Sequence, residues 1–213
     1  MSRELQALLE VAIEASRAAA TVALDWQRRP GLCVDQKAGR DDLVSQADRE
    51  AEAAAREVIR AARPRDGILG EEAGEQHGTS GYRWLVDPID GTTNYLYGRS
   101  DWAVSIAIER EADGRIVVGV VEEPALDRCT HAVRGGGAWA GTERCDITRD
   151  RPLIDALVEV NHGRPDQREC AGDVFGALID RARDVRRGGS AACALAQVAT
   201  GRADAYWGPG LRP

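Results

Sequence analysis

The sequence is poor in the residue patterns that build zinc and redox sites. It has 213 residues, with five cysteines and three histidines. The cysteine number is odd and no two cysteines have the C-x-x-C spacing, so the usual zinc and redox motifs are missing. The histidines, His77, His131 and His162, also lack ligand spacing, and we interpret each as a surface or loop residue. We expect every cysteine to be a reduced thiol in a cytoplasmic protein. The cysteines are Cys33, Cys129, Cys145, Cys170 and Cys193.

Long apolar runs and an excess of positive charge are missing as well. No run approaches the ~18 residues that a membrane-spanning helix needs, and the opening M-S-R-E-L-Q begins an amphipathic pattern rather than a signal peptide. The formal net charge is -7, which argues against a basic face that binds nucleic acid. We therefore expect neither a membrane nor a nucleic-acid partner. A phosphorylated substrate remains compatible, because bound divalent cations can reverse the local charge.

The apolar pattern predicts helices and strands that are mixed without regular alternation. Residues 3–28 and about 45–63 have helical spacing, and Pro64 closes the second helix. Helical character returns at about 167–183 and 190–200. Short apolar runs predict strands at 68–70, 84–86, 102–108, 116–121, 129–133 and 203–207.

This mixture favours an α+β layered sandwich over a doubly wound sheet, since strict βαβ alternation is missing. We expect residues 1–140 to form an N-terminal α+β domain that carries the functional site. Residues 141–213 would form a partial C-terminal α/β domain, in which 141–165 is weakly patterned and rich in loops.

Four acidic residues follow runs that we expect to be buried strands. Glu71 and Glu72 follow Ile68-Leu69-Gly70, Asp87 follows the run 84–86, and Asp90 comes three residues later. A carboxylate at the mouth of a buried strand is costly unless something pairs with it. These four residues therefore stand out among the many acidic residues of the chain.

The segment 87–94, D-P-I-D-G-T-T-N, combines the features of a metal site and a phosphate site. Pro88 fixes the backbone, so the turn can aim both aspartates and the Ile89 carbonyl at one place. Hard oxygen ligands of this kind suit Mg²⁺. Gly91 allows a close backbone approach, and Thr92 can open a helix whose N–H groups bind phosphate. Taken alone, D-x-x-D-G fits equally well a turn whose aspartates satisfy backbone donors.

The sequence G-E-E, followed by W-L-V-D-P-I-D-G-T-T-N-Y, resembles the signature of the inositol monophosphatases. Residues 42–48 resemble the family's D-x-V-T-x-x-D segment, with Ser45 where threonine is usual, and Lys37 stands where members often carry a loop lysine. Residues 119–138 resemble the strand pair after the metal motif, and 188–207 resemble the second signature. The resemblance covers essentially the whole chain. It implies the layered α-β-α-β-α sandwich of the inositol monophosphatase and fructose-1,6-bisphosphatase type.

The resemblance also implies a Mg²⁺-dependent, lithium-sensitive phosphomonoesterase that is a homodimer in its full-length form. The first Mg²⁺ would be held by Glu71, Asp87 and the Ile89 carbonyl, the second by Asp87 and Asp90, and Glu71 would also face a third, weaker ion. Thr92 and Asp48 would orient a metal-activated water beside Glu71. The implied catalytic residues are therefore Glu71, Thr92 and Asp48. The implied substrate-binding residues are Asp90, Gly91, Thr92, Gly189, Ser190 and Ala191.

The sequence departs from the family pattern near its end. Gly208 stands where inositol-specific members have an acidic residue, and Pro213 comes just before the register of a W-D pair that supplies a further metal aspartate. We therefore expect the second half of the fold to be incomplete. Inositol monophosphate is the leading substrate hypothesis. The alternatives are histidinol phosphate and 3′-phosphoadenosine 5′-phosphate as substrates. A further alternative is a non-catalytic binding protein of the same fold, a role suggested by some bacterial relatives that are implicated in transcription complexes.

Overall fold

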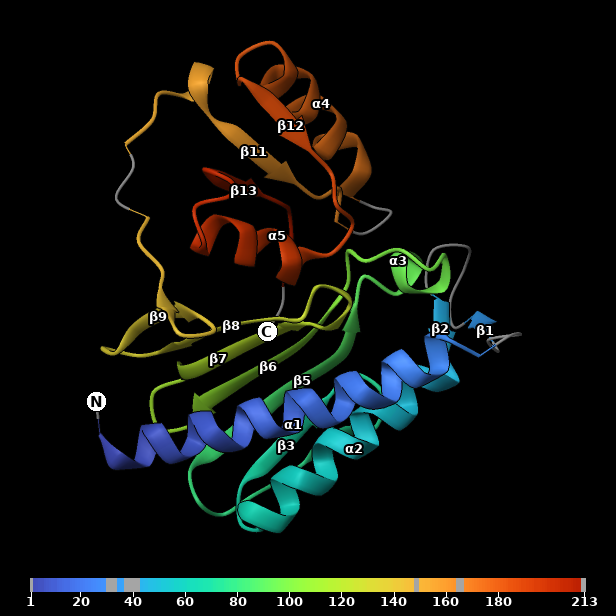
Figure 1. The fold of residues 1–213 in the computed structure, drawn as a ribbon, viewed down its shortest axis with the longest axis vertical. Helices are drawn as coiled ribbons and strands as arrows, with labels where there is room; N and C mark the ends of the chain where they lie inside the picture. The colour runs from blue at the N-terminus through green and yellow to red at the C-terminus, as the bar shows by residue number, and fades with distance from the viewer. Residues whose placement is uncertain (1, 30–33, 37–42, 148–149, 164–166, 212–213) are drawn as a thin grey trace.

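The computed structural model describes residues 2–29, 34–36, 43–147, 150–163 and 167–211. Within these ranges there are three sheets, and the two larger ones are stacked in layers with the helices (Figure 1). Lys37, Asp42 and Cys33, which the sequence singles out, lie outside the described residues.

Two long helices, α1 (Arg3–Gln27) and α2 (Gln46–Ala62), form one outer layer. Ser2 caps α1 by accepting a hydrogen bond from the Leu5 N–H at 3.2 Å. Both helices bury stripes of alanine, which let the helix backbones come close to each other and to the sheet. The predicted ranges 3–28 and 45–63 are confirmed to within one residue at each end.

The larger sheet has eight strands in the order β10-β9-β8-β7-β6-β5-β3-β4. Its neighbours pair antiparallel except β3 and β5, which run parallel. The face toward α1 and α2 carries the main core, with Trp84, Ile106 and Val120 buried there. The strands are β3 (Gly67–Gly70), β4 (Gly74–Gln76), β5 (Tyr82–Asp90), β6 (Ala103–Arg110), β7 (Arg115–Glu123), β8 (Arg128–Val133), β9 (Gly137–Ala140) and β10 (Glu143–Arg144).

Short elements connect these layers. Strands β1 (Val34–Gln36) and β2 (Leu43–Ser45) pair antiparallel just before α2. Helix α3 (Thr92–Leu96) follows β5 directly. Two single 3₁₀ turns lie at Pro124–Leu126 and Leu153–Asp155.

The smaller sheet has three parallel strands in the order β12-β11-β13. They are β11 (Leu157–Val160), β12 (Asp184–Arg186) and β13 (Ala205–Trp207). Helix α4 (Arg168–Ile179) covers the outer face, where Phe175 and Leu178 pack against the buried valines of β11. Helix α5 (Ala191–Ala199) lies between the two sheets (Figure 1).

The segment 141–165 is rich in loops, as expected, and contains the short strands β10 and β11 in its described residues. One expectation about the second half was wrong in detail. The helix predicted over 167–183 stops at Ile179, and the chain then enters β12. The order of layers is nevertheless α1 and α2, large sheet, α5, small sheet, α4, as the predicted α-β-α-β-α sandwich requires.

Two further expectations concern cysteines and membrane spans. Cys129, Cys145, Cys170 and Cys193 are free thiols. In the described part of the chain, every helix is too short or too polar to cross a bilayer.

Candidate active site

The site begins where β5 ends in the segment Asp87-Pro88-Ile89-Asp90. The pairing of β5 with β6 shifts register between Asp87 and Asp90, as expected where proline interrupts the ladder. The Asp87 carboxylate accepts a hydrogen bond from the Ile89 N–H at 3.2 Å. The Thr92 hydroxyl in turn donates to the Ile89 carbonyl at 3.2 Å. The segment is therefore folded on itself, with Asp87, Ile89 and Thr92 in direct contact.

Parallel pairing of β3 with β5 brings Glu71 to the same end of the sheet. Gly70 pairs with Val86, and the Glu71 N–H donates to the Val86 carbonyl at 3.2 Å. Parallel strands end at one edge, so Glu71 and Asp87 leave the sheet as neighbours. The third component is Asp48, which lies in the first turn of α2 and is buried.

These carboxylates also act on one another electrostatically. The pKa of Asp87 is raised well above its ordinary value, first by burial and then by the charges of Asp90, Glu71 and Asp48. A buried carboxylate among like charges favours the protonated form or a bound cation. The atoms that could bind a metal ion here are all oxygens, and Mg²⁺ prefers oxygen ligands. The site thus fits Mg²⁺ by donor type and by its need for positive charge.

The described residues do not, however, place three or more His, Cys, Asp or Glu side chains around a common point as a ready metal cage. Asp90 is hydrogen-bonded to the second half of the chain. Its Oδ2 atom accepts hydrogen bonds from the Ser190 hydroxyl and the Ala192 N–H, both at 2.6 Å. Burial raises the pKa of Asp90, and the bonds from Ser190, Ala192 and Ala191 act in the opposite direction.

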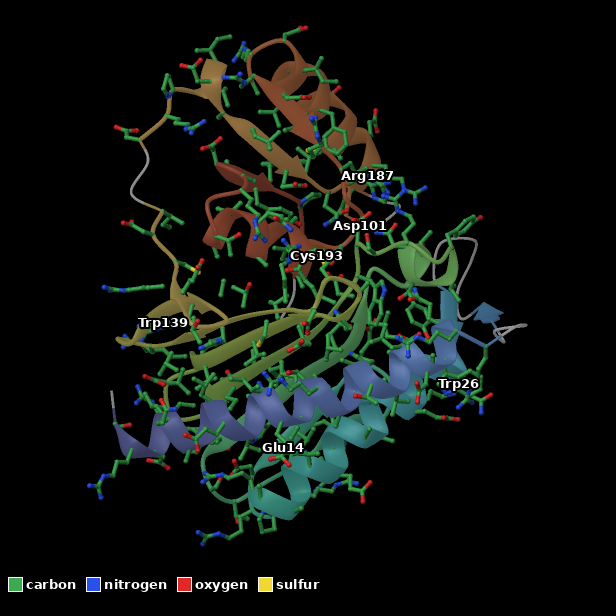
Figure 2. All side chains as sticks on the ribbon, in the orientation of Figure 1. Glu14, Trp26, Asp101, Trp139, Arg187 and Cys193 are labelled. Carbon is green, nitrogen blue, oxygen red and sulfur yellow. The ribbon has the colours of Figure 1, made fainter. Side chains whose placement is uncertain are left out.

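The residues predicted to line the substrate side reach the site from the other half of the chain. Ser190 is the N-cap of α5, and its hydroxyl accepts from the Cys193 N–H at 3.0 Å. The Asn94 amide donates to the Asp101 carbonyl at 2.6 Å and to the Gly188 carbonyl at 2.7 Å. Asp101 and Cys193 lie at the junction of the two sheets (Figure 2). Residues 188–191 are thus fixed beside the carboxylates by Asp90 and Asn94.

Gly91 has a backbone conformation and surroundings that disfavour any side chain. Its φ is 95°, and a Cβ there would lie 3.1 Å from both the Ser190 Cβ and the Asp101 carbonyl oxygen. It is the N-cap of α3, whose first backbone bond runs from the Tyr95 N–H to the Gly91 carbonyl at 3.0 Å. The backbone of Gly91 and Thr92 is therefore held close to Asp90 and Ser190.

An apolar cavity of about 230 Å³ lies between the large sheet and α5, and none of the acidic residues of the candidate site lines it. Ala107, Gly119 and Leu195 contribute to its lining, which includes no acidic, lysine or arginine side chain. His131 also lines it, so the expectation of a surface or loop histidine is wrong there. His131 lies on β8, and burial lowers its pKa. His77 is exposed as expected, and His162 lies in the loop after β11.

Sequence reasoning missed two residues near the site, Glu52 and Arg56 of α2. Both are buried, and the Arg56 Nε donates to Glu52 Oε1 at 2.7 Å. Their spacing gives a signal that could have found them. Asp48, Glu52 and Arg56 are spaced by four residues, and each directly follows a residue of the buried alanine stripe.

The chain is similar to several known proteins. A model of the inositol monophosphatase family matches residues 4–213. The inositol-1-monophosphatase of Rhizobium meliloti (strain 1021) is 42% identical over 213 residues, covering 94% of this chain and 76% of that protein. The Nus factor SuhB of Haemophilus influenzae is 36% identical, covering 96% of this chain and 77% of that protein. The crystal structure of the extragenic suppressor protein suhB from Bartonella henselae superposes with a TM-score of 0.90 at 36% identity, covering 97% of this chain and 80% of that chain.

Proposed function

The chain belongs to the inositol monophosphatase family and is a phosphomonoesterase, and from this premise we propose that it uses Mg²⁺ to hydrolyse inositol monophosphate. The observation that carries the proposal is the position of Asp87. Its side chain is half-buried, and its pKa is raised by burial and by the charges of Asp90, Glu71 and Asp48. Such a cluster is unfavourable by itself and becomes favourable when a cation neutralises it.

The family is generally metal-dependent. We assign the first ion to Glu71, Asp87 and the Ile89 carbonyl, and the second to Asp87 and Asp90. When bound, Mg²⁺ supplies positive charge for the attacking water and for the leaving oxygen.

The side chains of this protein then position the reactants. The Thr92 hydroxyl is oriented by its 3.2 Å bond to the Ile89 carbonyl. We assign Thr92, Asp48 and Glu71 to holding the attacking water, with a carboxylate accepting its proton. No covalent intermediate on the protein is needed, because an oriented water can displace the leaving alcohol in line.

The phosphate would be held by the backbone N–H groups of Gly91 and Thr92, where the chain enters α3. Gly189, Ser190 and Ala191 would face the alcohol part of the substrate. Their fixed placement beside Asp90 supports this assignment. Asp90 would then contact both ion and substrate.

A phosphate-release assay tests the proposal. The purified protein is given Mg²⁺ and, in separate reactions, inositol 1-phosphate, histidinol phosphate and 3′-phosphoadenosine 5′-phosphate. We expect turnover that is fastest on inositol 1-phosphate and that stops in EDTA. Faster turnover on either alternative would replace the substrate, and full activity in EDTA would overturn the metal mechanism.

A second candidate is favoured by the relatives named Nus factor SuhB, at 34–36% identity. In that case the protein would bind a protein partner in transcription, with or without phosphatase activity. The assay above separates the two. A well-folded protein that binds Mg²⁺ but hydrolyses none of the three phosphomonoesters would support the non-catalytic role.

A further inference from the structure

A buried ion pair on α2 holds the turn that carries Glu71. The Glu52 carboxylate has a side-chain exposure of 1%. It accepts hydrogen bonds from the Glu72 N–H at 2.7 Å and from the Ala73 N–H at 3.2 Å. Glu52 thereby replaces the backbone partners that a tight turn between β3 and β4 does not provide.

Arg56 holds the other side of the same turn. Its Nε donates to Glu52 Oε1 at 2.7 Å, and its terminal NH₂ group donates to the Gly74 carbonyl. The Arg56 side chain is only 6% exposed. The two side chains together contact the backbone of three consecutive residues, Glu72, Ala73 and Gly74, directly after Glu71.

The glycine of the G-E-E motif belongs to this arrangement. A Cβ at Gly70 would lie 2.1 Å from Glu52 Oε1 and 2.3 Å from its Cδ. Carbon and oxygen atoms cannot come so close, so the Glu52 carboxylate occupies the space that any other residue at 70 would need. The packing therefore places Glu52 directly against the strand end from which Glu71 emerges.

We propose that Glu52 and Arg56 are positioning residues that set the place of Glu71 in the metal site. The inference rests on the proposed function in one respect, the assignment of Glu71 as a Mg²⁺ ligand. A buried ion pair is a poor source of stability, because removing two charges from water offsets most of their attraction. Its geometric effect is larger, since residues behind a metal ligand fix that ligand's orientation.

The placement of Asp48 supports the same reading. Asp48, Glu52 and Arg56 are each four residues apart on α2 and are all buried. One face of α2 therefore presents Asp48 to the site and anchors the turn of Glu71. A shift of α2 would move both carboxylates together, which keeps their spacing constant.

The test is titration of the metal-free full chain with MgCl₂ alone, followed by calorimetry, together with thermal melting. The main variant is Glu52→Gln, which keeps the size of the side chain but removes its charge. We expect Mg²⁺ affinity to fall by about 10-fold or more, the range typical of residues behind metal ligands. Arg56→Lys is a second, conservative variant, for which we expect a smaller loss of Mg²⁺ affinity. It serves as the main test if Glu52→Gln does not fold.

Asp66→Asn is the matched control. Asp66 is also a buried carboxylate, and it accepts from Arg63 Nε and Trp84 Nε1, both at 2.9 Å. It lies at the opposite end of β3 from Glu71. We expect Asp66→Asn to lower the melting temperature and to leave Mg²⁺ affinity within twofold of wild type.

The variant Glu71→Gln distinguishes a failure of the ligand assignment of Glu71 from a failure of the positioning role of Glu52 and Arg56. If wild type binds no Mg²⁺, or Glu71→Gln binds it like wild type, the ligand assignment fails and the positioning role fails with it. If Glu71→Gln weakens binding but Glu52→Gln does not, only the positioning role is overturned. Equal weakening by Asp66→Asn and Glu52→Gln would also overturn it, because the effect would then be general destabilisation.

Discussion

The Asp90 carboxylate accepts a hydrogen bond of 2.6 Å from the Ser190 hydroxyl, although 100 residues separate the two in the sequence. The same oxygen accepts from the Ala192 N–H in the first turn of α5. A carboxylate at a helix N-terminus is favoured by the unpaired N–H groups and by the helix dipole. Asp90 therefore belongs both to the chemical site and to the joint between the two halves of the chain.

We predict that Asp90→Asn lowers activity by about 10²-fold or more while the protein stays folded. The amide keeps the shape and one oxygen acceptor but removes charge from an assigned metal position, where electrostatic effects reach several kcal/mol. Steady-state kinetics on inositol 1-phosphate and a thermal melt measure the two effects. Ser190→Ala is the control, with a cost of about 1 kcal/mol in stability from the lost cap and a smaller loss of activity. A larger activity loss in Ser190→Ala would contradict the role given to Asp90.

Asp87→Asn should stabilise the protein in EDTA while abolishing its activity. The pKa of Asp87 is raised in the folded state, so the folded protein holds more protons than the unfolded chain between the ordinary and the raised pKa. The free energy of unfolding of wild type therefore falls as pH rises through that interval. Urea unfolding at several pH values should show this slope in wild type and a weaker slope in the variant. An Asp87→Asn protein that is less stable in EDTA at neutral pH would argue against repulsion in the cluster.

Millimolar Mg²⁺ should raise the melting temperature of wild type, because an ion that binds only the folded state shifts unfolding by mass action. At 100 times the dissociation constant the gain is about 2.7 kcal/mol. The Asp87→Asn variant should gain far less. Scanning calorimetry with and without EDTA measures this, and Li⁺ should inhibit turnover in the matching assay. A melting temperature that is unchanged by Mg²⁺ would remove the main support for the metal site.

Glu71→Gln should be much more damaging to activity than Glu72→Gln. Glu72 takes part in the turn through its backbone N–H, which donates to Glu52 whatever its side chain is. Glu71, by contrast, is among the charges that raise the pKa of Asp87. A comparison of kcat/KM for the two variants decides the matter. If Glu72→Gln had the larger effect, Glu71 would lose its role as a ligand.

Cysteine alkylation should be strongly selective between the thiols of the second half. Cys193 is buried, and burial raises its pKa to about 12, so the reactive thiolate is rare at pH 8. Cys170 is exposed. Mass spectrometry after brief iodoacetamide treatment should find Cys170 modified first. Early modification of Cys193 in the native protein would show that α5 separates readily from the large sheet.

The first half of the fold could be predicted from the sequence because its elements are long and regular. Helices α1 and α2 bury alanine stripes over 25 and 17 residues, and β5, β6 and β7 are strands of eight or nine residues that each contain a shorter apolar run. Strands β11 and β12, of four and three residues, were missed. Strands β3 and β13 are as short but were predicted, so the difference lies in the pattern: Val185 is the only apolar residue of β12, and Glu159 interrupts the apolar residues of β11.

The residues of the candidate site also fall into two groups, those that a local sequence pattern marks and those that it does not. Glu71, Asp87 and Asp90 are marked by local motifs, because each follows an apolar run that forms a strand. Glu52 is marked only by its four-residue spacing from Asp48 and Arg56, because glutamate in an Ala- and Glu-rich helix is typical of a solvated face. The bond from Ser190 to Asp90 depends on how two distant segments pack together, which no window of sequence contains.

The two hydrogen bonds that the Asn94 amide donates also bear on the order in which the chain can fold during synthesis. Its amide donates to Asp101, made seven residues later, and to Gly188, made 94 residues later. At about 5–20 residues per second, the ribosome reaches Gly188 roughly 5 to 20 s after Asn94. The large sheet thus has time to fold with its acidic cluster still open on one side. A nascent chain arrested between Asn94 and Gly188 would present that half-built site to whatever cation or chaperone meets it first.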